Sequence, residues 1–263
     1  MARANLGSRR SCETIISEGR VTVNGHVAKL GDKADPARDR IEVDGQPLLV
    51  ATSAAPEPAF IYIALNKPRG VISSLEDELE AGRTTVRDLI DIENAQHIYP
   101  VGRLDKPSEG LVLMTNDGTL AHRLTHPRYG HEKVYAVTVE GHISERTLDQ
   151  WRRGVMLDNR ITAPAPIEVV ERDSDTTRLR IILREGRKRQ IRRIAAALGH
   201  PVRKLVRERI GPLSLGDLPT GQWRYLTDLE VDELKQSAAA DVVPRSSAPK
   251  SRKRRPVDMS HRN

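Results

Sequence analysis

Two short apolar runs, residues 98–101 and 111–114, enclose a loop that carries Gly102, Asp105 and Pro107. Runs of this length, bounded by glycine and proline, are typical of buried β-strands joined by a turn. The pattern therefore predicts that Asp105 lies on a rigid loop at the end of a strand. Such a position suits a carboxylate that acts on a substrate, because the sheet fixes its place and the loop leaves room beside it.

The sequence around Asp105 also has a plainer interpretation. An aspartate before Lys106 and Pro107 is commonly a turn residue whose carboxylate binds the nearby backbone. On spacing alone, this turn interpretation is favoured over catalysis.

The distribution of charge indicates a polyanionic partner. The net charge of the 263 residues is +7, but residues 184–209 hold ten Lys or Arg against two Glu, and residues 236–263 hold seven against two Asp. The rest of the chain is therefore acidic on balance. A basic block on such a body favours nucleic acid as the partner, because neutralising phosphates releases condensed counterions.

Composition excludes several other classes of protein. Cys12 is the single cysteine, so no intramolecular disulfide forms, which fits a reducing cytoplasm. No apolar run follows the arginines at the start of the chain, and none approaches the ~20 residues that span a bilayer. We therefore expect a soluble, cytoplasmic protein without a membrane partner.

Residues 1–50 predict a small domain of one helix and short strands. Ser8 is a candidate N-cap, Gly19 is the expected helix stop, and Asn24-Gly25 and Asp44-Gly45 are hairpin-turn signals. Alanine and proline mark residues 51–59 as a linker. Beyond it we expect one domain over 60–235 and a disordered basic tail over 236–263.

In the larger domain, apolar patterns and caps predict alternating strands and helices. The strand over 133–139 places Tyr135 and two valines on one face, which by pattern alone makes Tyr135 a core residue. The other predicted elements are a strand over 60–65 broken by turn residues 66–70, helices over 117–126 and 144–153, and a hairpin of 166–172 with 177–183.

Three histidines raise the question of a metal site. His122 and His126 are one helical turn apart, and His131 is nearby. No cysteine is near, and no carboxylate lies between the first two as in metalloprotease helices. We therefore interpret them as solvated histidines and predict no metal.

Residues 184–199 predict a helix with an apolar stripe and a basic start. Ile191, Ile194 and Leu198 recur at helical spacing, and Gly199 is a C-cap. The arginines near the helix start interact unfavourably with the positive end of the helix dipole, so helix stability alone does not explain their presence. A solvated basic helix is one interpretation, and a contact with anions from elsewhere is the other.

Several motifs together resemble one family. Gly102-Arg103-Leu104-Asp105, with Ser108-Glu109-Gly110-Leu111 and Thr115-Asn116-Asp117-Gly118, resembles the catalytic-aspartate motif of bacterial ribosomal RNA pseudouridine synthases, although Ser108 stands where threonine is more usual. The N-terminal Ser-Arg-Arg and Glu-Gly-Arg-Val-Thr-Val-Asn-Gly runs resemble the S4 RNA-binding domain. The likeness covers about residues 3 to 235 and is strongest to the large-subunit type B enzymes.

The resemblance implies an α+β fold, in which a small S4-like α/β module precedes a mixed, mainly antiparallel catalytic sheet. It implies isomerisation of uridine to pseudouridine in ribosomal RNA, of the large subunit first and the small subunit as the alternative. No cofactor, metal or nucleotide is implied. We expect a monomer whose partner is ribosomal RNA or a ribosome-assembly intermediate.

The resemblance also assigns roles to residues. It makes Asp105 the catalytic carboxylate, Tyr135 an active-site tyrosine and Arg192 the guanidinium that pairs with Asp105. A buried carboxylate requires such a cation to stay ionised. RNA-facing roles fall on Ser8, Arg9, Arg10, Arg20, Asn24, Arg103, Arg187, Arg189 and Arg193. The alternative for the N-terminal arginines is that they merely solvate a helix end.

Two rival functions remain at this point. One is an RNA-binding or ribosome-assembly protein without catalysis. The other is a glycosidase-like hydrolase that uses Asp105 with Glu109, which requires two carboxyls flanking one bond.

Overall fold

The computed structural model describes residues 9–48, 59–75, 82–92 and 98–240. The chain divides into two compact units, residues 1–59 and 60–263. Ser8, the predicted linker over 51–58 and the basic residues 241–263 lie outside the described residues.

The first unit is a helix with a small sheet of strand order β2-β1-β3-β4. Its turns follow the prediction: Asn24 and Asp44 each have a φ of 52° and precede glycines that also have positive φ. The apolar side of the helix includes buried Cys12. The elements are α1 (Arg9–Ser17), β1 (Val21–Val23), β2 (His26–Val27), β3 (Ile41–Val43) and β4 (Gln46–Pro47).

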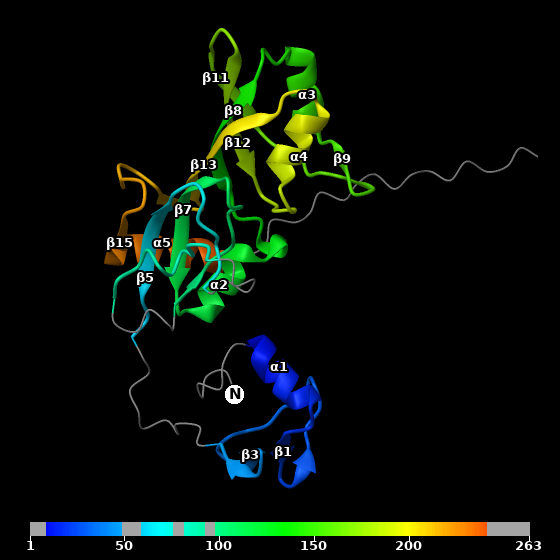
Figure 1. Ribbon diagram of the computed structural model, residues 1–263, viewed down its shortest axis with the longest axis vertical. Helices are drawn as coiled ribbons and strands as arrows, with labels where there is room; N and C mark the ends of the chain where they lie inside the picture. Colours follow the sequence, from blue (N-terminus) through cyan, green and yellow to red (C-terminus); the bar gives the residue numbers. More distant parts are fainter. Residues whose placement is uncertain (1–8, 49–58, 76–81, 93–97, 241–263) are drawn as a thin grey trace, which may run out of the picture. The chain divides into compact units, whose positions relative to one another are not determined.

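The second unit is built on a nine-stranded sheet of order β11-β12-β8-β13-β7-β5-β15, with β14 on β13 and β6 on β7 (Figure 1). β13 and β7 run parallel, whereas the other paired strands of this sheet are antiparallel. This confirms the mixed, mainly antiparallel prediction. The strands are β5 (Tyr62–Lys67), β6 (Tyr99–Pro100), β7 (Glu109–Thr115), β8 (Lys133–Glu140), β11 (Ile167–Arg172), β12 (Thr176–Leu183), β13 (Val202–Ile210), β14 (Leu213–Ser214) and β15 (Trp223–Tyr225).

Helices cover both faces of the sheet. On one face, α3 and α4 pack on a core that contains Tyr135, and Figure 1 shows them near β12. On the other face, α2 and α5 pack on a second core that contains Tyr62. The helical segments are α2 (Gly118–Thr125), η3 (Pro127–Tyr129), α3 (Glu145–Arg153), α4 (Gln190–Ala197) and α5 (Asp228–Ala239), and β9 (Met156–Leu157) pairs with β10 (Arg160–Ile161).

Local signals account for several helix ends. Asp117 accepts a hydrogen bond from the Leu120 N–H at the start of α2, and Ser144 accepts one from the Thr147 N–H at the start of α3. Gly199, with a φ of 83°, follows the end of α4.

Two predicted boundaries are wrong. The first strand of the second unit starts at Tyr62 and continues through Lys67, because Asn66 and Lys67 pair with Leu111 and Gly110 of β7. Helix α5 continues to Ala239, past the predicted start of the tail, because Ala238 is buried in the second core. No helix among the described residues is long and apolar enough to cross a membrane.

Gly110 allows β7 and β13 to approach each other closely. Its φ is 101°, and a Cβ atom added there would lie 2.4 Å from the Arg207 carbonyl oxygen. The two nearest atoms, the carbonyl oxygen and the nitrogen of Arg207, are backbone, which cannot move aside as a flexible side chain could. Gly110 is therefore required by both its dihedral angle and its neighbours.

Gly110→Ala should lower the free energy of unfolding by about 3 kcal/mol, because it adds backbone strain and overpacking. Urea denaturation measures the change. Gly186→Ala is the matched control, since no atom lies within 4 Å of its added Cβ. Equal stability of the two variants would contradict the close approach of the strands.

Candidate active site

The loop over residues 104–108 is fixed at successive positions. The Ser108 N–H donates to the Asp105 carbonyl at 2.9 Å, and the Gly70 N–H donates to the Lys106 carbonyl at 2.8 Å. The Ser73 hydroxyl lies 3.0 Å from the Leu104 carbonyl oxygen and 3.1 Å from its nitrogen. Asp105 is half-buried, so its carboxylate is held by a rigid backbone and still reaches solvent.

Lys67, at the end of β5, lies under this loop and is fully buried. Its ammonium donates to the Ser108 carbonyl at 2.7 Å and to the Pro68 carbonyl at 2.9 Å. Burial lowers the pKa of Lys67 to about 8, and the nearby carboxylates of Glu109 and Asp105 partly oppose this effect. By pattern alone, the sequence predicts a turn residue here.

Arg192 joins α4 to the same loop. Its guanidinium donates to the Pro107 carbonyl at 2.9 Å and to the Ser108 hydroxyl at 3.2 Å. These hydrogen bonds go to the loop and not to the Asp105 carboxylate, which acts on Arg192 through space. Burial lowers the pKa of Arg192, and Asp105 partly opposes that effect.

One row of residues crosses four strands below the loop. Lys67 of β5 is opposite Gly110 of β7, and Gly110 is opposite Arg207 of β13. Arg207 is in turn opposite Tyr135 of β8. Lys67 interacts electrostatically with Asp105 and with Arg207, and Arg207 interacts with Tyr135. The row therefore links Asp105 to Tyr135.

Arg207 and Lys133 add positive charge around Tyr135. Arg207 is 2% exposed, and its Nε donates to the Leu111 carbonyl at 2.7 Å. Burial lowers the pKa of Arg207, and the Tyr135 side chain beside it partly offsets that effect. Burial, with a contribution from Arg207, lowers the pKa of Lys133 to about 8. Neither cation was among the predicted site residues.

The structure places the other predicted arginines of the second unit in two groups. Arg187 donates to the carbonyls of Leu157, Arg160 and Ile161, and Arg193 forms an ion pair of 2.6 Å with Asp158. Both therefore hold the β9–β10 hairpin. Arg103 and Arg189 are exposed, and Arg189 adopts a left-handed conformation at the start of α4.

In the first unit, Arg20 and Asn24 make contacts within the domain. Arg20 binds Asp44 at 2.6 Å and Glu18 at 3.1 Å. The Asn24 side chain donates to Asp39 and accepts from the Arg40 N–H, both at 2.9 Å. Arg9 and Arg10 begin α1, and Ser8 lies outside the described residues.

The described part of the chain holds no group of three His, Cys, Asp or Glu side chains arranged to bind a metal. The rings of His122 and His126 lie 5.1 Å apart, and the His126 side chain accepts a hydrogen bond from the Arg128 N–H.

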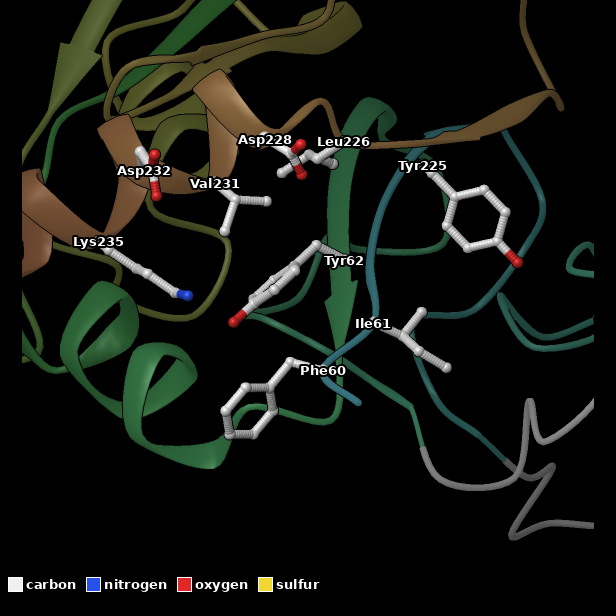
Figure 2. Close-up of a pocket in the computed structure, with 9 residues that line it drawn as sticks. All are labelled: Phe60, Ile61, Tyr62, Tyr225, Leu226, Asp228, Val231, Asp232 and Lys235. Carbon is white, nitrogen blue, oxygen red and sulfur yellow. The ribbon is translucent and has the colours of Figure 1, made fainter. Parts of the chain in front are cut away.

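A hollow of about 530 Å³ lies on the other side of the sheet, beside α5 (Figure 2). Tyr62 and Lys235 point into it, and Asp228 and Asp232 border it. None of the predicted site residues lines this hollow. Its carboxylates also make it a poor site for phosphate, so the loop around Asp105 remains the candidate active site.

Comparison with known proteins gives the class of this chain. The family model for RNA pseudouridylate synthase matches residues 61–197, and the S4 domain model matches residues 1–41. The matched region includes Asp105, Tyr135 and Arg192. The chain belongs to the RNA pseudouridylate synthase family, and it is an RNA pseudouridine synthase.

Individual relatives extend over nearly the whole chain. An uncharacterized RNA pseudouridine synthase of Aquifex aeolicus is 40% identical, covering 93% of this chain and 95% of that protein. Ribosomal large subunit pseudouridine synthase B of Bacillus subtilis is 42% identical, covering 90% and 94%. A crystal structure of a pseudouridylate synthase has 30% identity and a TM-score of 0.64, covering 86% and 94%.

The free energy of unfolding should rise with pH from about 8 towards the ordinary lysine pKa. In this window the folded chain has released protons from Lys67 and Lys133 that the unfolded chain still binds. Lys67→Met should make the rise smaller, because it removes one of these two groups. Urea denaturation at pH 7 to 10 measures the difference from the parent.

Lys204→Met, at an exposed position in β13, is the control for this titration and should keep the parent's slope. Identical slopes for the parent and Lys67→Met would show that the Lys67 ammonium is not titrating in this range.

Proposed function

We propose that this enzyme isomerises uridine in ribosomal RNA, with large-subunit RNA as its substrate. It acts as a monomer in the cytoplasm, on free RNA or on a ribosome-assembly intermediate. The observation that carries the proposal is the Asp105 loop, whose Ser108 and Pro107 carbonyls are bound by the cations of Lys67 and Arg192. Relatives named for the large ribosomal subunit support the choice of RNA.

Asp105 is the catalytic carboxylate in this proposal. The reaction breaks the bond between the ribose C1′ and the uracil N1, and positive charge develops at C1′. The carboxylate attacks that carbon or stabilises its charge. Lys67 and Arg192 support either route, because they place positive charge beside Asp105 and fix the backbone that carries it.

Tyr135 completes the site by stacking on the base or by moving a proton during the rearrangement. Its position in the first core, opposite Arg207, gives its ring a fixed orientation. The target uridine must leave its stack to reach Asp105, which costs a few kcal/mol.

Contacts with RNA phosphates offset that cost. The S4 unit, the exposed Arg103 and Arg189, and the basic residues 241–263 supply them in our proposal. Remote phosphate contacts position the RNA, whereas the pocket selects the base. Arg187 and Arg193 contribute less directly, because their guanidinium groups hold the β9–β10 hairpin.

Asp105→Asn should lower the rate of pseudouridine formation by at least about 10³-fold, because the neutral amide neither attacks nor stabilises the sugar carbon. The affinity for RNA should change little. The measurement uses unmodified transcripts of both ribosomal RNAs and maps pseudouridine by carbodiimide-dependent reverse-transcription stops.

Asp232→Asn, beside the hollow on the other side of the sheet, is the matched control and should keep the parent's activity. The absence of new stops with the parent protein on either RNA would overturn the proposal and favour the binding-only function. Release of free uracil would favour the hydrolase, in which Glu109→Gln would also be inactive. Stops on small-subunit RNA alone would change the substrate.

A further inference from the structure

Three buried cations lie in or beside the row of residues below the Asp105 loop. Lys67 and Arg207 are almost completely buried, and Lys133 is largely buried. Within the described residues, none of the three forms an ion pair with a carboxylate. Lys67 and Lys133 donate to backbone carbonyls, and Arg207 donates to the Leu111 carbonyl and also bonds the Tyr135 side chain. Burying charge without a counter-ion is costly, so the fold alone does not account for three such groups.

Arg207 and Lys133 both have unused hydrogen-bond donors. The Nη2 atom of Arg207 is buried and has no partner among the described residues. The Lys133 ammonium makes one long hydrogen bond, of 3.3 Å, to the His131 carbonyl. An ammonium has three donors, so Lys133 can still bind an anion.

The strand geometry places these donors beside Tyr135. Lys133 precedes Tyr135 by two residues on β8, so both side chains lie on the same face of the sheet. Arg207 is opposite Tyr135 on β13, and its charge interacts with Lys133. Lys133 retains some exposure, whereas Arg207 lies deeper.

We propose that Lys133 stabilises the negative charge that the uracil ring carries after its bond to the ribose has broken, with Arg207 positioned behind it. This inference rests on the proposed function. When the C1′–N1 bond breaks, its electron pair stays on the ring and spreads over N1 and the carbonyl oxygens. The ring then turns, C5 bonds to C1′, the C5 proton leaves and N1 gains a proton, so the reaction is balanced as an isomerisation.

The two sides of the site therefore have opposite electrostatic tasks. Asp105 acts on the sugar carbon, where positive charge develops, and Lys133 acts on the base, where negative charge develops. A fixed ammonium in a buried site is effective because it requires no reorganisation of solvent during the reaction. Lys133 is a catalytic residue in this scheme, whereas the buried Arg207 is a positioning residue.

Lys133→Met should lower the single-turnover rate about 100-fold, because the ring anion loses one fixed donor. The dissociation constant for RNA should stay within about threefold, since the charge forms only as the bond breaks. Lys133→Arg should recover much of the rate. Lys235→Met, at an exposed position in α5, is the matched control and should behave as the parent.

A substrate RNA with 5-fluorouridine at the target position separates this role from a structural one. Fluorine stabilises the ring anion, so bond cleavage should depend less on Lys133. The rate of C1′–N1 cleavage should therefore fall less in Lys133→Met with 5-fluorouridine than with uridine. A merely structural defect would lower both rates by the same factor.

This inference would be overturned if Lys133→Met lowered the cleavage rate by the same factor with both substrates, or if the variant were as active as an active parent. Either result would leave the proposed function intact. A parent that forms no pseudouridine would overturn the proposed function itself. Denaturation of each variant in urea shows whether the fold is retained.

Discussion

The Lys67 ammonium joins the two loops that border the active site. It donates to carbonyl oxygens on both sides, Pro68 in its own loop and Ser108 after Asp105. These bonds form in the absence of bulk water, since the side chain is fully buried. The position of Asp105 relative to the sheet therefore depends on a charged group that the fold has difficulty burying. The free-energy cost of burying the ammonium lowers the pKa of Lys67. Its hydrogen bonds make the site rigid, but the buried charge leaves the fold less stable than it could be.

The order of the strands brings distant parts of the sequence together. β7 is antiparallel to β5 and parallel to β13, so one row contains Lys67, Gly110, Arg207 and Tyr135. Gly110 is essential to this row because the backbone of Arg207 occupies the space of a side chain. Helix α4 contributes Arg192, which donates to the Pro107 carbonyl and the Ser108 hydroxyl of the Asp105 loop. Positive charge is thus concentrated on one face of the sheet, while the carboxylates beside α5 lie on the other.

The sequence predicts most elements and the central loop, but it does not predict what surrounds that loop. Periodicity and caps locate β8 and α3, since these signals are local. Lys67 resembles a turn residue because proline follows it, and its place in β5 depends on pairing with Gly110, far along the chain. Arg207 is indistinguishable in sequence from its exposed neighbours Arg203 and Lys204, because burial is decided by the strands on either side. Arg193 similarly has its partner, Asp158, in a separate hairpin.

The most direct test is a crystal structure of Asp105→Asn with an RNA hairpin from the region that the parent enzyme modifies. We expect one extruded uridine, with its ribose C1′ beside residue 105, its ring on Tyr135 and a carbonyl oxygen bound by Lys133. An RNA bound by the S4 unit alone, or a uridine lodged in the hollow beside α5, would contradict this mechanism.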